Sequence, residues 1–264
     1  MTATSATRTV RRYERDAFEG VWNREWTLFR RFWASTTFSS VVQPTIYLLA
    51  FGLGVGTLVS TVDGIPYVEY VGTGTVATAV LFASAFPGMF NTYVKRVFQR
   101  SYDAMLAAPV TVEELVTAEG TWIAAKAGAY GTVPLVVTFF FGLTPAWGML
   151  AVPFIGFLTG LGFAFFGMWT SSVVKTIDSF TYVTSAVLTP LFLVAGTFFP
   201  ITNLPQWAQV LAQLNPLYHC VQLVRDACFG WRWPEDLGHL LFLVAFAGLM
   251  WVLAVRGLRG KLVG

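Results

Sequence analysis

Five long runs without Asp, Glu, Lys or Arg constrain this chain more than any other feature of its sequence. They cover residues 32–62, 70–94, 127–174, 179–224 and 237–255 and are 31, 25, 48, 46 and 19 residues long. A helix needs about 20 largely apolar residues to cross a bilayer. The charged fraction of 12% is about half that of an ordinary soluble domain. The runs therefore predict an all-α polytopic membrane protein, and they exclude a disordered chain or a soluble enzyme of ordinary composition.

The lengths of the runs and their breaks predict six membrane-spanning helices. Gly142 and Pro145 divide the 48-residue run into two spans, and Pro200 ends the apolar part of the 46-residue run, because Gly and Pro interrupt helices. We expect a cytoplasmic N-terminal segment over 1–34 and a transmembrane domain over 35–264. The expected spans in that domain are 37–60, 70–93, 122–142, 147–170, 179–199 and 237–256.

The positions of Lys and Arg predict the orientation. Fifteen of the 17 lie in the N-terminal segment, the loops after spans two and four, the start of span three and the C-terminal tail. Only Arg225 and Arg232 lie in segments on the opposite side. Because basic residues accumulate on the cytoplasmic side of a membrane, both termini are expected in the cytoplasm. The chain would then be a multi-pass protein of the cytoplasmic (inner) membrane.

Apolar residues from Val10 to Trp33 recur in steps of three and four, with Trp22 and Trp26 among them. This spacing predicts a helix with one apolar face, and its many arginines favour the membrane interface beside anionic lipids. The helix either anchors the first span or also touches a cytoplasmic partner, and the two interpretations are compatible.

The loop 94–121 is the longest hydrophilic stretch after the N-terminus. Thr111 and Glu114 have the spacing of a capping box. We therefore expect one helix that continues from the second span to about Ala107, a turn at Pro109 and a new helix from Val112. This elbow is either an ordinary helical hairpin or a docking surface for a soluble subunit, with apolar anchors inside a charged rim. Its exposed surface is expected to carry Tyr102, Asp103, Met105, Leu106, Glu113 and Glu114.

The segment 200–225 is free of charge until Arg225, and Pro200, Pro205 and Pro216 interrupt it. Apolar residues over 207–214 and 217–224 suit two short helices, each too short to cross a bilayer. They form either a re-entrant hairpin that dips into the outer leaflet or a loop that lies flat on the membrane.

Several kinds of catalytic and binding chemistry are absent from the sequence. Lys261 is the only lysine that follows a glycine, and a leucine comes next, so the chain has no phosphate-binding loop. His219 and His239 are the only histidines, and we expect each to be a packing residue. Cys220 and Cys228 lack metal-ligand spacing and are expected to be unpaired rather than bridged. We predict no catalytic, cofactor-binding or metal-binding residue and no nucleic-acid partner.

The central spans also hold no carboxylate. Ion-coupled transporters place ionisable residues within their spans, so this absence argues against an ion-driven transporter. It argues equally against a membrane enzyme that depends on carboxylates.

Seven stretches of the chain resemble those of a known family. They are Tyr102 to Glu114, Glu119 before Trp122, Phe157 to Phe163, Leu188 to Phe192, Gly196 to Pro200, Leu204 to Trp207 and Asn215 to His219. The chain resembles the ABC-2 type permeases, the membrane subunits of ABC exporters, and is most similar to their NodJ-like branch, which is associated with lipo-oligosaccharide export. The likeness runs from about Arg30 to the C-terminal tail.

The resemblance implies the ABC-2 exporter fold, with six spans, an interfacial N-terminal helix and a re-entrant hairpin between spans five and six. It implies two permease subunits, here a homodimer in membrane lipid, and separate ATP-binding cassette ATPase subunits that hydrolyse ATP. The loop would couple to the ATPase through Tyr102, Asp103, Met105, Leu106, Pro109, Glu113, Glu114 and Glu119. The hairpin would include Gly196, Phe199, Pro200, Pro205, Trp207, Asn215, Pro216 and His219.

The implied function is ATP-driven export of an amphiphilic molecule: a lipid-linked oligosaccharide, a polysaccharide, a lipid or a drug. A charge-free, aromatic route along spans one, two and five of two subunits suits such a substrate. The alternatives are a polytopic transferase that modifies lipids and a channel or scaffold without ATP coupling. A neighbouring reading frame with a phosphate-binding loop would favour the exporter.

Overall fold

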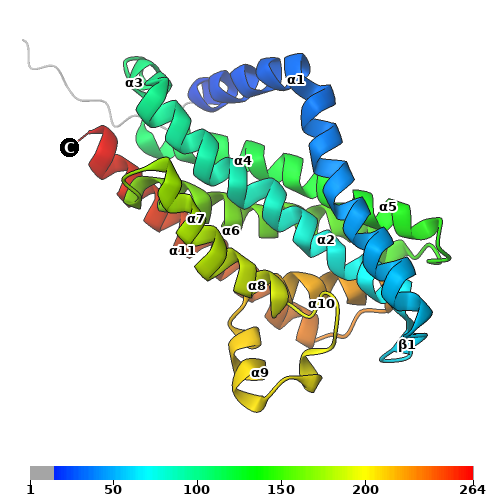
Figure 1. The fold of residues 1–264 in the computed structure, drawn as a ribbon. Helices are drawn as coiled ribbons and strands as arrows, with labels where there is room; N and C mark the ends of the chain where they lie inside the picture. The colour runs from blue at the N-terminus through cyan, green and yellow to red at the C-terminus, as the bar shows by residue number, and fades with distance from the viewer. Residues whose placement is uncertain (1–14, 264) are drawn as a thin grey trace, which may run out of the picture.

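The computed structural model describes residues 15–263, which are almost entirely helical (Figure 1). The α-helices are α1 (Arg15–Leu49), α2 (Tyr67–Phe86), α3 (Ser101–Leu106), α4 (Val112–Gly131), α5 (Val133–Phe139), α6 (Val152–Val173), α7 (Phe180–Val183), α8 (Thr189–Leu193), α9 (Gln206–Gln213), α10 (Pro216–Phe229) and α11 (Glu235–Leu262). The π and 3-10 turns are η1 (Ala50–Gly54), η2 (Val55–Thr57), η3 (Pro87–Asn91), η4 (Val94–Phe98), η5 (Trp147–Ala151), η6 (Ile177–Ser179), η7 (Thr184–Leu188) and η8 (Ile201–Asn203). Two short strands, β1 (Thr61–Val62) and β2 (Ile65–Pro66), pair antiparallel. The start of the helix predicted from Val10, with Arg8, Arg11 and Arg12, lies outside the described residues.

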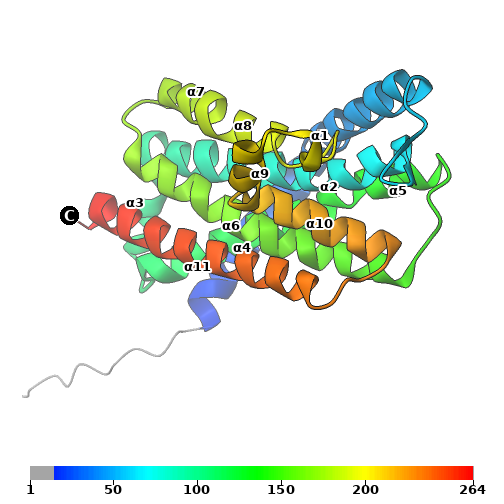
Figure 2. The ribbon, with the colours of Figure 1, turned by 90° about the horizontal axis from the view of Figure 1, so that it is seen from below.

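Helix α6 lies at the centre of the bundle. It packs against α2, α4 and α11, while α10 runs beside α2 and α11 (Figures 1 and 2). Fully buried side chains such as Leu81, Phe163 and Leu243 join α2, α6 and α11 in one apolar cluster, to which α10 also contributes. Figure 1 places α3 and the C-terminus at one end, which we call the loop end. The end that carries β1, β2, α9 and the last turns of α10 is called the hairpin end.

Glycines let α6 approach its neighbours closely. A side-chain carbon on Gly167 of α6 would lie 2.6 Å from the carbonyl oxygen of Ala85 in α2. One on Gly156 of α6 would lie 3.1 Å from the Cα atom of Gly128 in α4. Small residues at such contacts are a means by which helices associate in lipid. These glycines therefore serve packing within one chain.

Within the described residues 15–263, three helical segments are long and apolar enough to cross a membrane. They are Tyr67–Phe98, Trp147–Val173 and Glu235–Leu262, with 32, 27 and 28 residues, and they contain the predicted spans 70–93, 147–170 and 237–256. The other three predicted spans fall on helices that are bent or broken. Span 37–60 falls on the second half of α1 and the turns after it, span 122–142 on α4 and α5, and span 179–199 on η6 to α8.

Prolines lie at two of these breaks and at the end of α2. A proline has no N–H to donate, and its ring clashes with the carbonyl group four residues earlier in a helix. Pro87 begins the π-helical turn η3 at the end of α2. Pro134 lies in the first turn of α5, where α4 has just ended, and Pro190 follows the π-helical turn η7. Each proline therefore interrupts regular α-helical bonding within a predicted span.

Helix α1 bends at Phe32, whose dihedral angles of φ −118° and ψ 17° are not helical. Figure 1 shows the part before the bend running at a steep angle to the part after it. The bend lies close to residue 34, where we predicted the boundary between the N-terminal segment and the transmembrane domain. The predicted amphipathic helix and the first span are thus continuous in the chain but differ in direction.

The loop 94–121 differs from its prediction at one point. We expected one helix from the second span to about Ala107, but the helix ends at Phe98 and Arg100 takes a left-handed φ of 49°. Helix α3 then begins at Ser101. After this break the ring of Tyr102 is fully buried, a tertiary contact that the local sequence does not show.

The β1–β2 hairpin is absent from the sequence prediction. Val62 pairs with Ile65 across a turn formed by Asp63 and Gly64. These two residues have φ of 50° and 79°, the left-handed geometry that Asp-Gly favours in two-residue hairpins. The Asp63-Gly64 pair is the sequence signal for this β-hairpin. A prediction based on long apolar runs does not detect it.

Candidate functional site

Helix α4 begins with the predicted capping box. The Glu114 N–H donates to the Thr111 hydroxyl at 3.3 Å, and the Thr111 N–H donates to the Glu114 carboxylate at 2.8 Å. These bonds satisfy donors that a helix start otherwise leaves free. Glu114 is buried, so the expectation that it lies on the exposed surface of the elbow is wrong. Its carboxylate is used to start the helix.

Four polar side chains from four segments meet in a buried group, which we call the loop-end charge cluster. Lys95, at the end of the second span, contacts Glu25 of α1 at 2.8 Å and also contacts Glu119 of α4. The Tyr102 hydroxyl of α3 donates to the other carboxylate oxygen of Glu119. No member is more than 9% exposed. Buried charges must be paired and hydrogen-bonded. The contacts of this cluster therefore hold α1, the second span, α3 and α4 together.

Tyr102 and Glu119 are interior members of this cluster. Burial, with the adjacent Glu119 carboxylate, raises the pKa of Tyr102 well above its usual value. The phenol therefore stays protonated and can donate its hydrogen bond. The expectation that Tyr102 lies on the exposed elbow is wrong, since its ring is fully buried. Glu119, which the resemblance placed among the coupling residues, is only 2% exposed.

Aromatic side chains of α1 pack beside the cluster. The Trp22 indole N–H donates to the Thr121 hydroxyl at 3.2 Å. The rings of Trp22, Trp26 and Phe29 all stand edge-on to Trp122 of α4, with centroids 5.2 to 6.0 Å away. The aromatic part of the predicted amphipathic face therefore contacts α4 of the same chain.

Glu113 also has a partner within the chain. Its carboxylate forms an ion pair with Arg259, near the C-terminal end of α11. Of the residues expected to dock on the ATPase, Asp103 and Pro109 remain exposed, and Met105 and Leu106 are half-buried. The exposed face of the elbow is thus smaller than the sequence suggests.

At the hairpin end, α9 and α10 match the two short helices predicted over 207–214 and 217–224. The Asn215 side chain accepts a hydrogen bond from the Leu217 N–H at 2.9 Å and donates to the Leu191 carbonyl at 2.7 Å. Pro216 occupies the first turn of α10, where a missing N–H leaves no bond unmade. The Asn-Pro pair therefore starts α10 and ties it to α8.

The carbonyl group of Gly196 joins three segments of the hairpin end. It accepts hydrogen bonds from the Tyr70 hydroxyl of α2 at 3.2 Å and from the Arg225 guanidinium of α10 at 2.7 Å. The guanidinium carbon lies 3.6 Å from the centre of the Tyr70 ring. Gly196 has a φ of 79°, which favours glycine. Arg225 is 7% exposed, and no carboxylate of the described residues lies within ion-pair distance of it.

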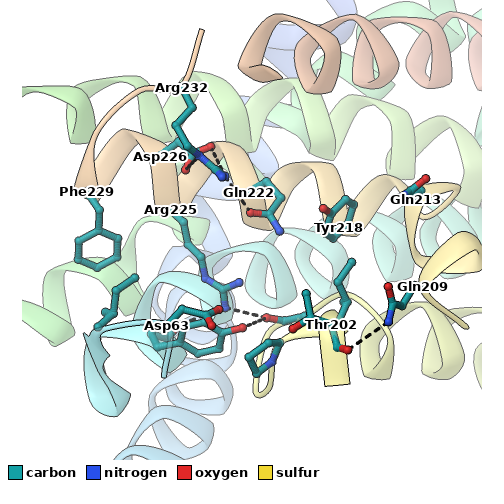
Figure 3. Close-up of a pocket in the computed structure, with 15 residues that line it drawn as sticks. Asp63, Thr202, Gln209, Gln213, Tyr218, Gln222, Arg225, Asp226, Phe229 and Arg232 are labelled. Atoms are coloured by element: carbon teal, nitrogen blue, oxygen red, sulfur yellow. Dashed lines mark hydrogen bonds and ion pairs between the residues drawn. The ribbon is translucent and has the colours of Figure 1, made fainter. Parts of the chain in front are cut away.

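A pocket of about 400 Å³ opens at the hairpin end (Figure 3). Its wall comes from the β1–β2 turn, the segment after α8, and one face each of α9 and α10. The volume lies within the range of about 300–1,000 Å³ that is usual for ligand sites. Its polar lining residues are Asp63, Tyr70, Thr202, Gln209, Gln213, Tyr218, Gln222, Arg225, Asp226 and Arg232.

Asp226 has an unusual protonation equilibrium in this wall. It forms an ion pair of 2.9 Å with Arg232 and lies near Asp236 at the start of α11. Burial raises the pKa of Asp226 to about 6, with Asp236 raising it further and Arg232 opposing the shift. The native state therefore holds this proton more tightly than the unfolded chain does. The resulting stabilisation is complete below the ordinary carboxyl pKa of about 4 and is lost as the pH rises through about 6.

Asp226→Asn is expected to remove this pH dependence, because asparagine does not titrate. The unfolding temperature of the variant, relative to that of the unsubstituted protein, should be higher at about pH 7.5 than at about pH 4.5. Thermal unfolding of both purified proteins at the two pH values measures this difference. A difference that is independent of pH, or that changes in the opposite direction, would contradict the assignment.

Of the residues predicted for the re-entrant hairpin, five line either the pocket or an apolar groove. Gly196 and Pro200 line the pocket. Pro205, Trp207 and Asn215 line the groove, which has a volume of about 480 Å³ and is otherwise walled by apolar side chains between η7 and α9. The Trp207 side chain is 68% exposed. The pocket and the groove share α9 but no lining residue.

His219, also predicted for the hairpin, meets the only other histidine. Its Nδ1 atom lies 2.7 Å from Nδ1 of His239 in α11, and its Nε2 atom lies 2.8 Å from the Gln213 carbonyl oxygen. Both rings are thus hydrogen-bonded packing residues, in agreement with the prediction. Cys220 and Cys228 are free and buried, as expected. Phe199 is 39% exposed.

Most of the pocket wall consists of residues that were not predicted as site residues. Tyr218, Gln222 and Arg225 recur in steps of four and three, which places polar groups on one face of α10. Gln209 and Gln213 do the same on α9. These spacings were readable, but nothing in the sequence shows that the two faces meet.

A family described as ABC-2 type transporter matches residues 16–229 of the chain. Nodulation protein J of Rhizobium meliloti (strain 1021) is 30% identical over 244 residues, which cover 92% of this chain and 93% of that protein. Inner membrane transport permease YadH of Escherichia coli (strain K12) is 27% identical over 250 residues, which cover 91% of this chain and 95% of that protein. The family match over residues 16–229 includes the loop, the groove and every pocket-lining residue except Arg232.

Proposed function

Because the chain belongs to the ABC-2 type transporter family, we propose that it is the membrane subunit of an ATP-driven exporter. It is an integral inner membrane protein and a transport permease. Its substrate in the proposal is an amphiphile, of the kind of a lipid-linked oligosaccharide, polysaccharide, lipid or drug, which leaves the cytoplasm or the inner leaflet. ATP is hydrolysed by a separate ATPase subunit, with which membership of the family implies association.

The proposed topology has six spans, with the loop end and both termini in the cytoplasm. Fifteen of 17 basic residues on one side support this orientation. The three long apolar helices and the bent helices between them supply the spans. The segment 200–225 forms the re-entrant hairpin on the outer side, and two copies of the chain form the transport route along spans one, two and five.

The loop-end charge cluster is the observation that carries the proposed coupling. It fixes α3 to the second span through Lys95 and Glu119, and to α1 through Glu25. A displacement of α3 by a closing ATPase would therefore move these helices as a unit. Asp103 and Pro109 are the exposed residues through which we expect the ATPase to make contact.

Asp103→Lys is expected to weaken association with the ATPase while leaving the permease in the membrane. Reversing a charge at an interface can cost about 2–5 kcal/mol, which is roughly a thirtyfold loss or more. Asp178→Lys is the matched control, because Asp178 is exposed but lies after α6, outside the loop. The measurements are membrane abundance, co-purification with the ATPase of a neighbouring reading frame, and ATP hydrolysis stimulated by candidate substrates.

Two results would count against the exporter. The first is equal co-purification of Asp103→Lys and Asp178→Lys with the ATPase, which would remove the elbow from the interface. The second is saturable ATP binding by the permease purified alone, because the sequence has no phosphate-binding loop.

A further inference from the structure

We propose that the pocket at the hairpin end binds the uncharged, hydroxyl-rich head of the exported amphiphile, while its hydrocarbon chain lies in the apolar groove on the other side of α9. That the ligand is the exported molecule rests on the proposed function. The chemistry of its head group is argued from the pocket alone.

The charged side chains that line the pocket sum to no net charge. The lining holds two arginines and two aspartates. Arg232 is paired with Asp226 at 2.9 Å. Arg225 is held by the Gly196 carbonyl and the Tyr70 ring. An anionic head would meet two carboxylates as well as the guanidinium groups, so the wall favours a ligand without net charge.

The remaining polar groups both donate and accept hydrogen bonds. Gln213 and Gln222 carry amides, which offer donors and an acceptor, and Thr202 and Tyr218 carry hydroxyls. The Gln209 amide nitrogen already donates to the Thr202 and Leu204 carbonyls, so Gln209 offers its oxygen as an acceptor. Figure 3 shows Gln222 and Tyr218 projecting from α10 over the space that Thr202 and Gln209 border on the opposite side. A hydroxyl group complements such a wall because it too donates and accepts. A saccharide presents several of them on a compact ring.

Arg225 adds an unused donor beside this space. The hydrogen bonds of its guanidinium to the Tyr70, Gly196 and Thr197 carbonyls all come from one terminal nitrogen. Its side chain is only 7% exposed, and Figure 3 shows one terminal nitrogen directed away from the bonded carbonyls, toward the open middle of the pocket. This second terminal nitrogen can donate to an acceptor oxygen of a ligand.

Helix α9 separates the polar pocket from the apolar groove. Gln209 and Gln213 lie on its pocket face, whereas Ala208 and Leu211 line the groove. Leu211 is 55% exposed, although it belongs to an aliphatic wall. A hydrocarbon chain in the groove would cover this surface, and the same molecule would place its polar head on the other face of the helix.

Cysteine protection in the full chain, reconstituted in lipid nanodiscs, tests the site. Thr202→Cys places a thiol in the pocket wall, and Gln206→Cys places one on α9 outside the pocket and the groove. Burial raises the pKa of the native Cys220 and Cys228 to about 12, so they stay as unreactive thiols. The probes are dodecyl maltoside, dodecylphosphocholine with the same chain and a zwitterionic head without hydroxyl groups, and maltose without a chain.

Dodecyl maltoside is expected to slow labelling at position 202 in a saturable manner and to leave position 206 unchanged. Adding Gln213→Leu and Gln222→Leu should raise the concentration needed by about tenfold, the loss of one or two hydrogen bonds. Dodecylphosphocholine and maltose should protect only at much higher concentrations. An unchanged labelling rate without any probe shows that the leucine variant keeps the pocket intact.

Equal protection at positions 202 and 206 would overturn the site, because it reports unspecific partition into the lipid. Equal protection by dodecylphosphocholine would overturn the chemistry of the head, and unchanged protection in the leucine variant would overturn the role of the amides. The assay contains no ATPase. Failure of the export proposal appears in co-purification and ATP hydrolysis, so the two failures are distinguishable.

Discussion

Lys95→Ala is expected to destabilise the protein strongly, because it breaks the loop-end charge cluster. Removing the lysine leaves the buried Glu119 carboxylate without a cation, and it leaves Glu25 with Arg24, at 2.8 Å, as its remaining cation. Breaking a buried ion pair in this way costs about 3–5 kcal/mol. Because the loop-end charge cluster also holds α3, association with the ATPase should fail together with stability. Thermal unfolding in detergent and ATPase co-purification measure the two effects.

Lys175→Ala is the matched control for this prediction. Lys175 is exposed and lies in the loop after α6, so its removal should leave both readouts close to those of the unsubstituted protein. Combining Lys95→Ala with Glu119→Gln should cost less than the sum of the two changes, since the second removes a charge that the first leaves unpaired. Equal unfolding temperatures for Lys95→Ala and Lys175→Ala would show that the cluster contributes no stability.

Arg225→Ala is expected to loosen the hairpin end and to reduce export. The guanidinium contacts the Gly196 carbonyl and the Tyr70 ring. Hydrogen bonds from a charged group contribute about 1.5–3 kcal/mol, and each 1.4 kcal/mol is a factor of about ten. The segment that carries Gly196 should therefore open at least about tenfold more often. The labelling rate of a cysteine at Thr197, which follows Gly196 and is fully buried, reports this opening, and export by the assembled transporter reports its consequence.

Two further variants test whether Arg225 acts through the geometry of its guanidinium group or only through its positive charge. Arg225→Lys is not expected to rescue, because an ammonium group cannot both stack on the Tyr70 ring and reach the carbonyl in the planar arrangement of a guanidinium. Arg232→Ala should have a smaller effect, because its side chain is 52% exposed and exposed ion pairs contribute about 0–1 kcal/mol. Full rescue by lysine, or a larger effect at Arg232, would contradict the structural role assigned to Arg225.

The two ends of the bundle are held together in a similar way. At each end a buried cation links segments that are distant in sequence, Lys95 at the loop end and Arg225 at the hairpin end. Buried cations are expensive to leave unpaired, so any change in the relative position of their helices must break or exchange these contacts. In the proposed exporter, the two cations are where the work of the ATPase would be transmitted and where outward opening would begin.

Local signals were readable from the sequence. Apolar runs identify the helices Tyr67–Phe98, Trp147–Val173 and Glu235–Leu262 because a bilayer requires a minimum apolar length whatever the neighbours of a helix are. The capping box at Thr111 and the start of α10 at Asn215 were also readable. Their bonds join residues two or three positions apart, so the order of the residues suffices to predict them.

Only the tertiary structure decides which polar residues are buried and with which partners. Glu119 and Tyr102 look like surface residues of a hydrophilic loop, yet they close a cluster with Lys95 and Glu25, which is 70 positions away from Lys95. Arg225 meets the Tyr70 backbone across 155 positions. The reason is physical: the free energy of a charge depends on the atoms that replace its water, and those atoms are chosen by the packing of helices. The sequence by itself determines a polytopic, helical chain of this family, and its tertiary structure determines where the charges lie.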